Sequence, residues 1–421
     1  MCENTKKNYL KDLLNIAFPI ILGNISFILI GIGDIIVAGR HSTQTFAAIS
    51  IANAFINCIM TLAIGLIAGI SPLLSNYRGE GKIIKRYFYP SIRFSMFLAF
   101  LMMVFILLVV PIIPYMGYEQ NLSKDIQQYM IISAFSTFGG CLHMCLKEFL
   151  QAYEIVLFPN LLALFSIFLN LLLNIVFVFG FGFIKPMGAV GLAVATFFVR
   201  YFMGFALLVF CFVNMNFKNF SEKDYYKKLI KIGLPLSVAI LIEFFAFNSI
   251  SIVMGRVAGV YAATQNLMCS LTTISFMVPL AISNAIAVKV GFSNGARNYE
   301  DVKNYSLYGS FSSVAFMFCS AVLFLSFPNE IISVFTKDEK IYELALPIML
   351  FLGCFQIFDG LQISLQGICK GLKNTSILTF ANFFAYWIIS RAKIKNVFKR
   401  LLDWFTLRSC CSLYYSYFFS L

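Results

Sequence analysis

Three carboxylates lie inside long apolar stretches of this sequence. Glu243 is the one charged residue in LSVAILIEFFAFNSISIV (residues 236–253), Asp34 lies in GIGDIIVAGR, and Asp359 lies in CFQIFDGLQISLQ. A charged side chain at the centre of a bilayer costs about 2.5 to 3.5 kcal/mol on insertion scales, so such residues usually face a cavity and work there. A carboxylate in such a cavity can hold a proton or, together with carbonyl oxygens, a hard cation.

The depths of the three acids differ. Glu243 follows Ile232 by 11 residues, roughly 16 Å along a helix, which places it near the middle of a bilayer. Asp34 lies toward the end of its apolar run, where it could instead cap the helix or reach the interface. Two asparagines in SIFLNLLLNIVFVFG, Asn170 and Asn174, are four residues apart and share a helix face. They are either packing contacts between helices or neutral cation ligands.

The elements that must position these residues are membrane spans. The chain of 421 residues is 60% hydrophobic and only 12% charged, whereas about a quarter of a soluble domain is charged. Runs of about 20 apolar residues, long enough to cross a bilayer, lie near 13–37, 46–75, 88–113, 126–146, 157–180, 188–213, 229–254, 261–288, 306–327 and 341–368, and an eleventh begins near 376. The N-terminal stretch leads directly into the first span, so we expect no cleaved signal peptide.

The net charge of +13 follows the spans and does not indicate nucleic-acid binding. When Lys and Arg before residue 391 are assigned to alternate sides, 19 fall on the side of the N-terminus and 6 on the opposite side, with Arg200 inside a span. This bias predicts a multi-pass protein of the cell inner (plasma) membrane with its N-terminus in the cytoplasm.

Cysteine and histidine give little support to a metal centre or an enzyme. Most of the 11 cysteines lie in apolar spans and no CxxC occurs, so they are expected to be small reduced hydrophobic residues. In CLHMC, the His143 side chain points away from those of Cys141 and Cys145 on a helix. An intramembrane enzyme would need clustered His, Asp or Ser chemistry, and His41 and His143 form no such pattern.

An internal repeat organises the chain. IAFP at 16–19 and IVAGR at 36–40 return as IGLP at 232–235 and IVMGR at 252–256, with the same spacing between the two motifs in each copy. The ungapped alignment that places residue 16 on residue 232 pairs Phe27 with Glu243 and Asp34 with Ile250. The acids are therefore not part of the repeat.

The repeat predicts an all-α polytopic membrane protein of two six-helix units in a parallel, pseudo-twofold arrangement. The predicted lobes are residues 1–213 and 229–390, joined by a cytoplasmic linker at 214–228. This is the layout of secondary transporters that hold a cavity between two bundles. Channels and scaffolds can also arise by duplication, but transport is favoured.

The residues carry a family resemblance. The chain resembles the multidrug and toxic compound extrusion (MATE) family, and is most similar to its NorM-like bacterial branch, over residues 12 to about 390. The motifs are the proline-led first and seventh helices, RGEG at 78–81, NGAR at 294–297, PMGAVGLAVAT at 186–196, LPLSVAILIE, and FDGLQISLQGICKGLKNTS at 358–376.

The resemblance implies twelve helices in two lobes, a central cleft, and export of organic cations driven by inward Na⁺ or H⁺. It assigns cation coupling to Glu243 and Asp359 in the C-terminal lobe, and to Asp34, Asn170 and Asn174 in the N-terminal lobe. The family's sodium site often has a Tyr one turn before the tenth-helix Asp, and here that residue is Phe355, which weakens the case for Na⁺. We expect no cofactor beyond the coupling ion, no firm metal site, a surrounding of membrane lipid, and a monomer.

The end of the chain breaks these patterns. Residues 391–421 carry six of the 32 basic residues on the side that topology assigns to the outside, so only about 10 or 11 of the 12 expected helices are intact. Leu401 to Phe405 can be written TTA TTG GAT TGG TTT, which one nucleotide later encodes Tyr-Trp-Ile-Gly, similar to the family's last helix. The aberrant basic tail is therefore either a frameshift product, which resequencing near Ser390 would test, or a native amphipathic tail on the membrane surface.

The sequence favours a cation-coupled multidrug antiporter that works by alternating access. An oligosaccharide-lipid flippase of the same superfamily is the alternative, but it would be expected to line its cavity with arginines, and only Arg200 lies well within a span. A truncated and inactive transporter is the third interpretation.

Overall fold

The structure is a computed structural model that describes residues 8–182, 184–215, 217, 223–257, 259–336 and 338–383. These residues are almost entirely helical, and the one β-bridge among them joins Phe181 to Ile184. The predicted tail at 391–421, with its frameshift interpretation, and residues 216 and 218–222 of the predicted linker lie outside the described residues.

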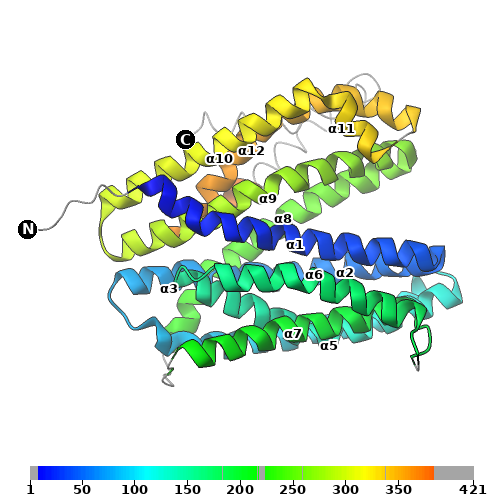
Figure 1. The fold of residues 1–421 in the computed structure, drawn as a ribbon, viewed down its shortest axis with the longest axis horizontal. Coiled ribbons are helices and arrows are strands. Elements are labelled where there is room, and N and C mark those ends of the chain that lie inside the picture. The colour runs from blue at the N-terminus through cyan, green and yellow to red at the C-terminus, as the bar shows by residue number, and fades with distance from the viewer. Residues whose placement is uncertain are drawn as a thin grey trace, which may run out of the picture. The chain divides into compact units, whose positions relative to one another are not determined.

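The helices follow the predicted spans (Figure 1). In chain order they are α1 (Tyr9–His41), α2 (Thr43–Ala68), α3 (Ile70–Gly79), η1 (Ile84–Tyr87), α4 (Phe88–Val109), η2 (Val110–Met116), α5 (Gln120–Ala152), α6 (Leu157–Phe179), α7 (Ala189–Asn214), α8 (Lys223–Val257), α9 (Gly259–Gly295), α10 (Tyr299–Ser326), α11 (Pro328–Phe335), α12 (Glu339–Gly371) and α13 (Ser376–Phe383).

Within the described residues, nine helices are long and apolar enough to cross a membrane, and α2 with α3 counts as one of them. A tenth span arises if the two parts of α12, Glu339–Met349 and Phe351–Gly371, are joined across their bend of 51°. Pro347 lies inside α12 just before this bend, and proline both lacks a backbone donor and clashes with the preceding turn. The prediction of an all-α, multi-pass membrane protein is confirmed.

The chain forms two compact units whose boundaries fall inside helices. We call residues Phe18–Ser237 the N-unit, and the described residues before Phe18 and after Ser237 the C-unit. α1 therefore begins in the C-unit and continues in the N-unit, and α8 begins in the N-unit and continues in the C-unit. The lobe boundaries expected from the sequence stay a prediction.

In the N-unit, α5 packs against α2, α4 and α7. The backbones of α5 and α7 come close at Gly139 of α5, where a Cβ atom would lie 2.8 Å from the backbone nitrogen of Tyr201 in α7. Only glycine allows the two helix backbones to come this near, as is common between membrane helices.

In the C-unit, α12 packs against α9 and α10. Ser313 of α10 donates a hydrogen bond to the carbonyl oxygen of Gly360 in α12 at 2.7 Å. The N-unit has a matching bond, from Ser95 of α4 to the carbonyl oxygen of Cys141 in α5, also at 2.7 Å. The pair α4 and α5 thus packs as α10 and α12 do, so that Ser95 corresponds to Ser313 and Cys141 to Gly360.

The first turns of α1 and α8 are held by Tyr9 and Tyr225, which occupy matching positions of the internal repeat. Tyr9 donates to an Asp301 carboxylate oxygen at 3.1 Å, and Tyr305 of α10 donates to Asp12 at 3.0 Å; Figure 1 shows the start of α1 beside α10. In the N-unit, the Tyr225 hydroxyl lies 2.6 Å from a serine hydroxyl of α4. Each tyrosine therefore ties its helix to the unit that contains most of the other repeat.

Candidate cation site

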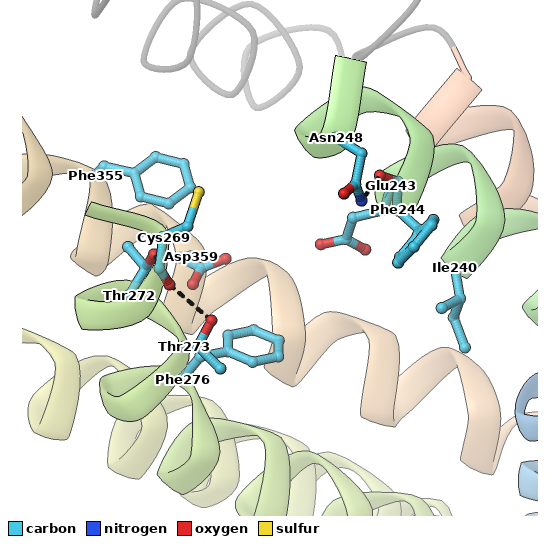
Figure 2. A pocket seen from close by; sticks show the side chains of 10 residues that line it. All are labelled: Ile240, Glu243, Phe244, Asn248, Cys269, Thr272, Thr273, Phe276, Phe355 and Asp359. Atoms are coloured by element: carbon cyan, nitrogen blue, oxygen red, sulfur yellow. Dashed lines mark hydrogen bonds between the residues drawn. The ribbon is translucent and has the colours of Figure 1, made fainter. Parts of the chain in front are cut away.

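A cavity of about 330 Å³ lies in the C-unit between α8, α9 and α12. Figure 2 shows the side chains around it. Glu243 comes from the middle of α8 and Asp359 from α12, and both carboxylates point into the same space. The two acids that the sequence singled out in this half of the chain are brought together.

The rest of the lining is largely aromatic and apolar. It consists of Ile240, Phe244 and Asn248 of α8, Cys269, Thr272, Thr273 and Phe276 of α9, and Phe355 of α12. The residues of α8 recur at intervals of three or four, so they form one face of that helix. Three phenylalanine rings beside two acids can bind a flat cation through cation-π contacts as well as charge.

Neither carboxylate forms a hydrogen bond or an ion pair with a residue that the structure describes. Asp359 is 8% exposed and Glu243 is half-buried. The two acids are close enough for each charge to act on the other, and Lys370 is within electrostatic range of Glu243. Two negative charges held away from water repel one another, so a bound proton or cation relieves the cost of keeping both.

The hydroxyl groups of α9 were not foreseen. Thr272 donates to the Met268 carbonyl at 2.8 Å, and Thr273 donates to the Cys269 carbonyl at 2.7 Å. Each hydroxyl oxygen thereby keeps lone pairs that can accept a hydrogen bond or ligate a cation. The available sequence signal was the polar pair TT inside the apolar run of residues 261–288.

Phe355 lines the cavity at the position where the resemblance implies a tyrosine. Two glutamines follow on the same helix but do not line the cavity. The Gln356 amide donates to Ser275 at 2.8 Å, and among the described residues the buried Oε1 atoms of Gln356 and Gln362 have no hydrogen-bond partner. Carboxylate, hydroxyl and amide oxygens are the ligands that hard cations prefer. The carboxylate and hydroxyl oxygens that line the cavity therefore fit Na⁺ as well as a proton, although the tyrosine hydroxyl is missing.

The three residues predicted for the N-terminal lobe also come together. The Asn174 amide donates to Asp34 Oδ1 at 2.7 Å and to Asn170 Oδ1 at 3.0 Å, and all three side chains are buried. Arg200 of α7 is within electrostatic range of Asp34 and donates to Ser136 at 2.9 Å. Asp34 therefore has hydrogen-bond donors as well as a nearby positive charge, whereas Glu243 and Asp359 have no such donors among the described residues. The roles of these five residues in cation binding stay predictions.

Relatives of known type cover most of the chain. The multidrug resistance protein NorM of Photobacterium profundum is 24% identical over 392 residues, which is 90% of this chain and 85% of that protein. The probable multidrug resistance protein NorM of Photorhabdus laumondii is 26% identical over 417 residues, covering 95% and 89%.

Solved structures share the fold. A MOP superfamily transporter from Pyrococcus furiosus superposes with a TM-score of 0.86 at 17% identity, covering 98% of this chain and 93% of that one. A eukaryotic MATE transporter gives a TM-score of 0.84 at 16% identity, covering 97% and 92%.

The sequence matches the MatE family twice, over residues 19–176 and 235–391. The two matches begin at Pro19 and Pro235, the prolines that the internal repeat pairs with each other. The chain therefore belongs to the MatE family, whose members are membrane transporters and not enzymes.

Proposed function

We propose that this chain exports aromatic organic cations across the inner membrane in exchange for H⁺ or Na⁺, with its N-terminus in the cytoplasm. The observation that carries the proposal is the pair Glu243 and Asp359, which share a cavity without a hydrogen-bonded or ion-paired partner among the described residues. Relatives named multidrug resistance proteins support the same substrate class.

The chemistry of exchange follows from competition for two negative charges. A drug cation and the coupling ion each neutralise carboxylate charge, so the binding of one weakens the electrostatic attraction for the other in a low-dielectric site. Entry of H⁺ or Na⁺ from outside therefore weakens the bound drug, and a drug arriving from the cytoplasm displaces the ion. Alternating access of the cavity turns this competition into antiport.

The size and lining of the cavity indicate which cations fit. A volume of about 330 Å³ is at the lower end of pockets for drug-sized ligands, roughly 300 to 1,000 Å³. Phe244, Phe276 and Phe355 supply the aromatic faces. We propose a planar substrate that carries one positive charge.

The Asp34 cluster has a secondary part in this proposal. Its acid is hydrogen-bonded by Asn174 and lies near Arg200, so its charge is already partly compensated. We propose that the Asp34 cluster has a smaller effect on the rate of transport, and that the exchange of drug for coupling ion takes place mainly at Glu243 and Asp359. No cofactor besides the coupling ion and no stable oligomer is part of the proposal.

The test is efflux of a fluorescent planar cation from cells that express the full chain. Na⁺ and pH gradients are varied separately, so that the gradient which accelerates efflux identifies the coupling ion. Glu243→Gln and Asp359→Asn are each expected to lower gradient-driven efflux by about tenfold or more, because each removes a charge from a buried site.

The matched control is Glu330→Gln, which removes an exposed acid of the C-unit outside the cavity and should leave efflux unchanged. Membrane levels of each variant are measured by immunoblot. Efflux by Glu243→Gln at the rate of the unaltered chain, at equal protein level, would rule out the proposed exchange site.

A further inference from the structure

The matching hydrogen bonds fix which residues of α5 and α12 are equivalent. Because Cys141 corresponds to Gly360, the ungapped alignment of these two helices pairs Gly140 with Asp359, His143 with Gln362, and Lys147 with Gln366. The first helices keep the alignment of residue 16 on residue 232, which pairs Phe27 with Glu243. Both acids of the cavity thus have counterparts in the N-unit.

The counterparts form a cluster with basic side chains. His143 and Lys147 are four residues apart and share one face of α5, and both lie against Phe27 of α1. The Lys147 ammonium is 5.4 Å from the centroid of the Phe27 ring, and the His143 ring centroid is 5.7 Å from it. An acid and neutral amides in one repeat are replaced by an aromatic ring and two bases in the other.

The Nε2 atom of His143 and the Lys147 ammonium have no hydrogen-bond partner among the described residues. His143 is 3% exposed, and its Nε2 atom has no hydrogen-bond partner. Among the described residues, Lys147 forms no hydrogen bond or ion pair; Glu148, its neighbour in sequence, acts on it electrostatically. A buried imidazole nitrogen is costly unless it forms a hydrogen bond, and the partly buried ammonium beside it favours a negatively charged acceptor.

The position equivalent to Asp359 is also positive. A Cβ atom on Gly140 would lie 3.5 Å from Cδ and 4.0 Å from Nε of Arg200, so the arginine side chain covers the glycine. The N-unit therefore presents positive groups where the C-unit presents carboxylates. Such a site favours an anion and disfavours a cation.

We propose that Phe27, His143 and Lys147 form a subsite that binds the carboxylate of a small aromatic molecule. The Lys147 ammonium and the His143 imidazole N–H donate charge-assisted hydrogen bonds to the carboxylate oxygens. The Phe27 ring, 43% exposed, offers an apolar face for the attached aromatic group. The subsite assigns recognition of an aromatic carboxylate to the N-unit, and its existence does not depend on ion coupling at Glu243.

The test is equilibrium dialysis of labelled 2-naphthoate against the full chain in phosphatidylcholine nanodiscs, with 2-naphthylmethanol as the neutral analogue. The unaltered chain is expected to bind naphthoate at least about tenfold more tightly than the alcohol, because charge-assisted hydrogen bonds contribute only to the anion. Lys147→Met should remove this preference and leave alcohol binding unchanged. Lys147→Arg should retain it.

Two further variants keep the outcome interpretable. Phe27→Glu places a carboxylate beside Lys147 at a half-exposed position, so it should abolish naphthoate preference without removing buried packing. Lys124→Met removes an exposed lysine of the same helix and should change nothing. A thermal melt of each variant separates misfolding from lost binding.

A second arm distinguishes a soluble carboxylate from an anionic lipid headgroup. Naphthoate binding is repeated in nanodiscs that contain phosphatidylglycerol, and it should stay within about threefold of its value in phosphatidylcholine, since a surface potential of about −30 mV lowers the local concentration of a free anion by that factor. Competition by phosphatidylglycerol that Lys147→Met relieves would overturn the small-molecule assignment. Equal naphthoate binding by the unaltered chain and a folded Lys147→Met would overturn the subsite itself.

Discussion

In the C-unit, Glu243 of α8 points into the same cavity as Asp359 of α12; at the equivalent positions of the N-unit, α1 carries Phe27 and α5 carries Gly140. The helices beneath these residues pack alike, as the hydrogen bonds of Ser95 and Ser313 demonstrate. Duplication has therefore preserved the contacts between helices while the charges on their inner faces diverged. In this chain the residues that pack the helices together are therefore different from the residues that carry charge.

The divergence extends to how each acid is supported. Asp34 of the N-unit receives a hydrogen bond from Asn174 and has Arg200 nearby, whereas the acids of the C-unit have no such donors among the described residues. A compensated acid exchanges its cation with less effect on the surroundings than an uncompensated pair does. The comparison predicts unequal consequences when corresponding features of the two repeats are altered.

The largest effect is expected from Glu243→Phe, which gives the C-unit the residue of the N-unit. Efflux of a planar cation should fall by about a hundredfold or more, because removing a buried charge partner costs about 3 kcal/mol. Transport assays in inverted vesicles measure it, with Ile240→Phe as the control for added ring volume at the cavity. A loss as large in Ile240→Phe would attribute the effect to volume and not to charge.

A smaller effect is expected from Asp34→Asn. Efflux should fall roughly fivefold, which corresponds to about 1 kcal/mol for one altered hydrogen-bonded acid. The same vesicle assay compares this variant with Glu243→Gln. If Asp34→Asn proved the more damaging of the two, the N-unit and not the C-unit would be the principal exchange site.

Substitution of Arg200 tests whether its positive charge is the reason that Asp34→Asn is expected to lower efflux less than substitution of Glu243 does. In the background of Arg200→Met, Asp34 loses its nearby positive charge, so Asp34→Asn should become more damaging, with a coupling energy of about 0.5 to 1.5 kcal/mol between the two sites. A double-mutant cycle on efflux rates measures this energy. Additive effects of the two substitutions would mean that Arg200 only holds Ser136 and does not act on the acid.

The smallest effect concerns the scaffold that the repeats share. Ser95→Ala and Ser313→Ala should each lower the free energy of unfolding by about 1 kcal/mol, since each removes one buried hydrogen bond between helices, and the two losses should be equal within error. Thermal denaturation of purified protein checks this. Ser312→Ala, whose hydroxyl bonds only within its own helix and is exposed, should be neutral; unequal losses at Ser95 and Ser313 would argue against equivalent packing.

The fold could be predicted from the sequence because its signals are long and periodic. Apolar runs and the internal repeat predicted a multi-pass bundle, and the motifs around Glu243 and Asp359 predicted the family, as the match to MatE confirms. The clustering of Asp34 with Asn170 and Asn174 followed from helix-face spacing and the resemblance together. In each case the signal was a regular spacing within one helix, a spacing between the repeats, or a motif of the family.

The contacts that could not be predicted from the sequence are those that depend on the direction of a side chain. Lys147 and Lys370 were counted as basic residues of the cytoplasmic side, yet Lys370 is buried and Lys147 lies over an aromatic ring. His143 was considered with Cys141 and Cys145, whereas its neighbours are Phe27 and Lys147. A lysine near the end of a span is ambiguous in sequence, because its long side chain reaches water or a neighbouring helix equally well.

The tyrosine contacts at the start of α1 determine the order in which this protein can be assembled. Tyr9 and Asp12 bond to Asp301 and Tyr305, which follow them by 292 and 293 residues in the chain. At synthesis rates of about 5 to 20 residues per second, the first helix waits roughly 15 to 60 s for the segment it must meet. The unit that contains Glu243 therefore cannot close around its earliest segment until late in translation, and slow pairing of this kind leaves the nascent first helix dependent on lipid or chaperones for that interval.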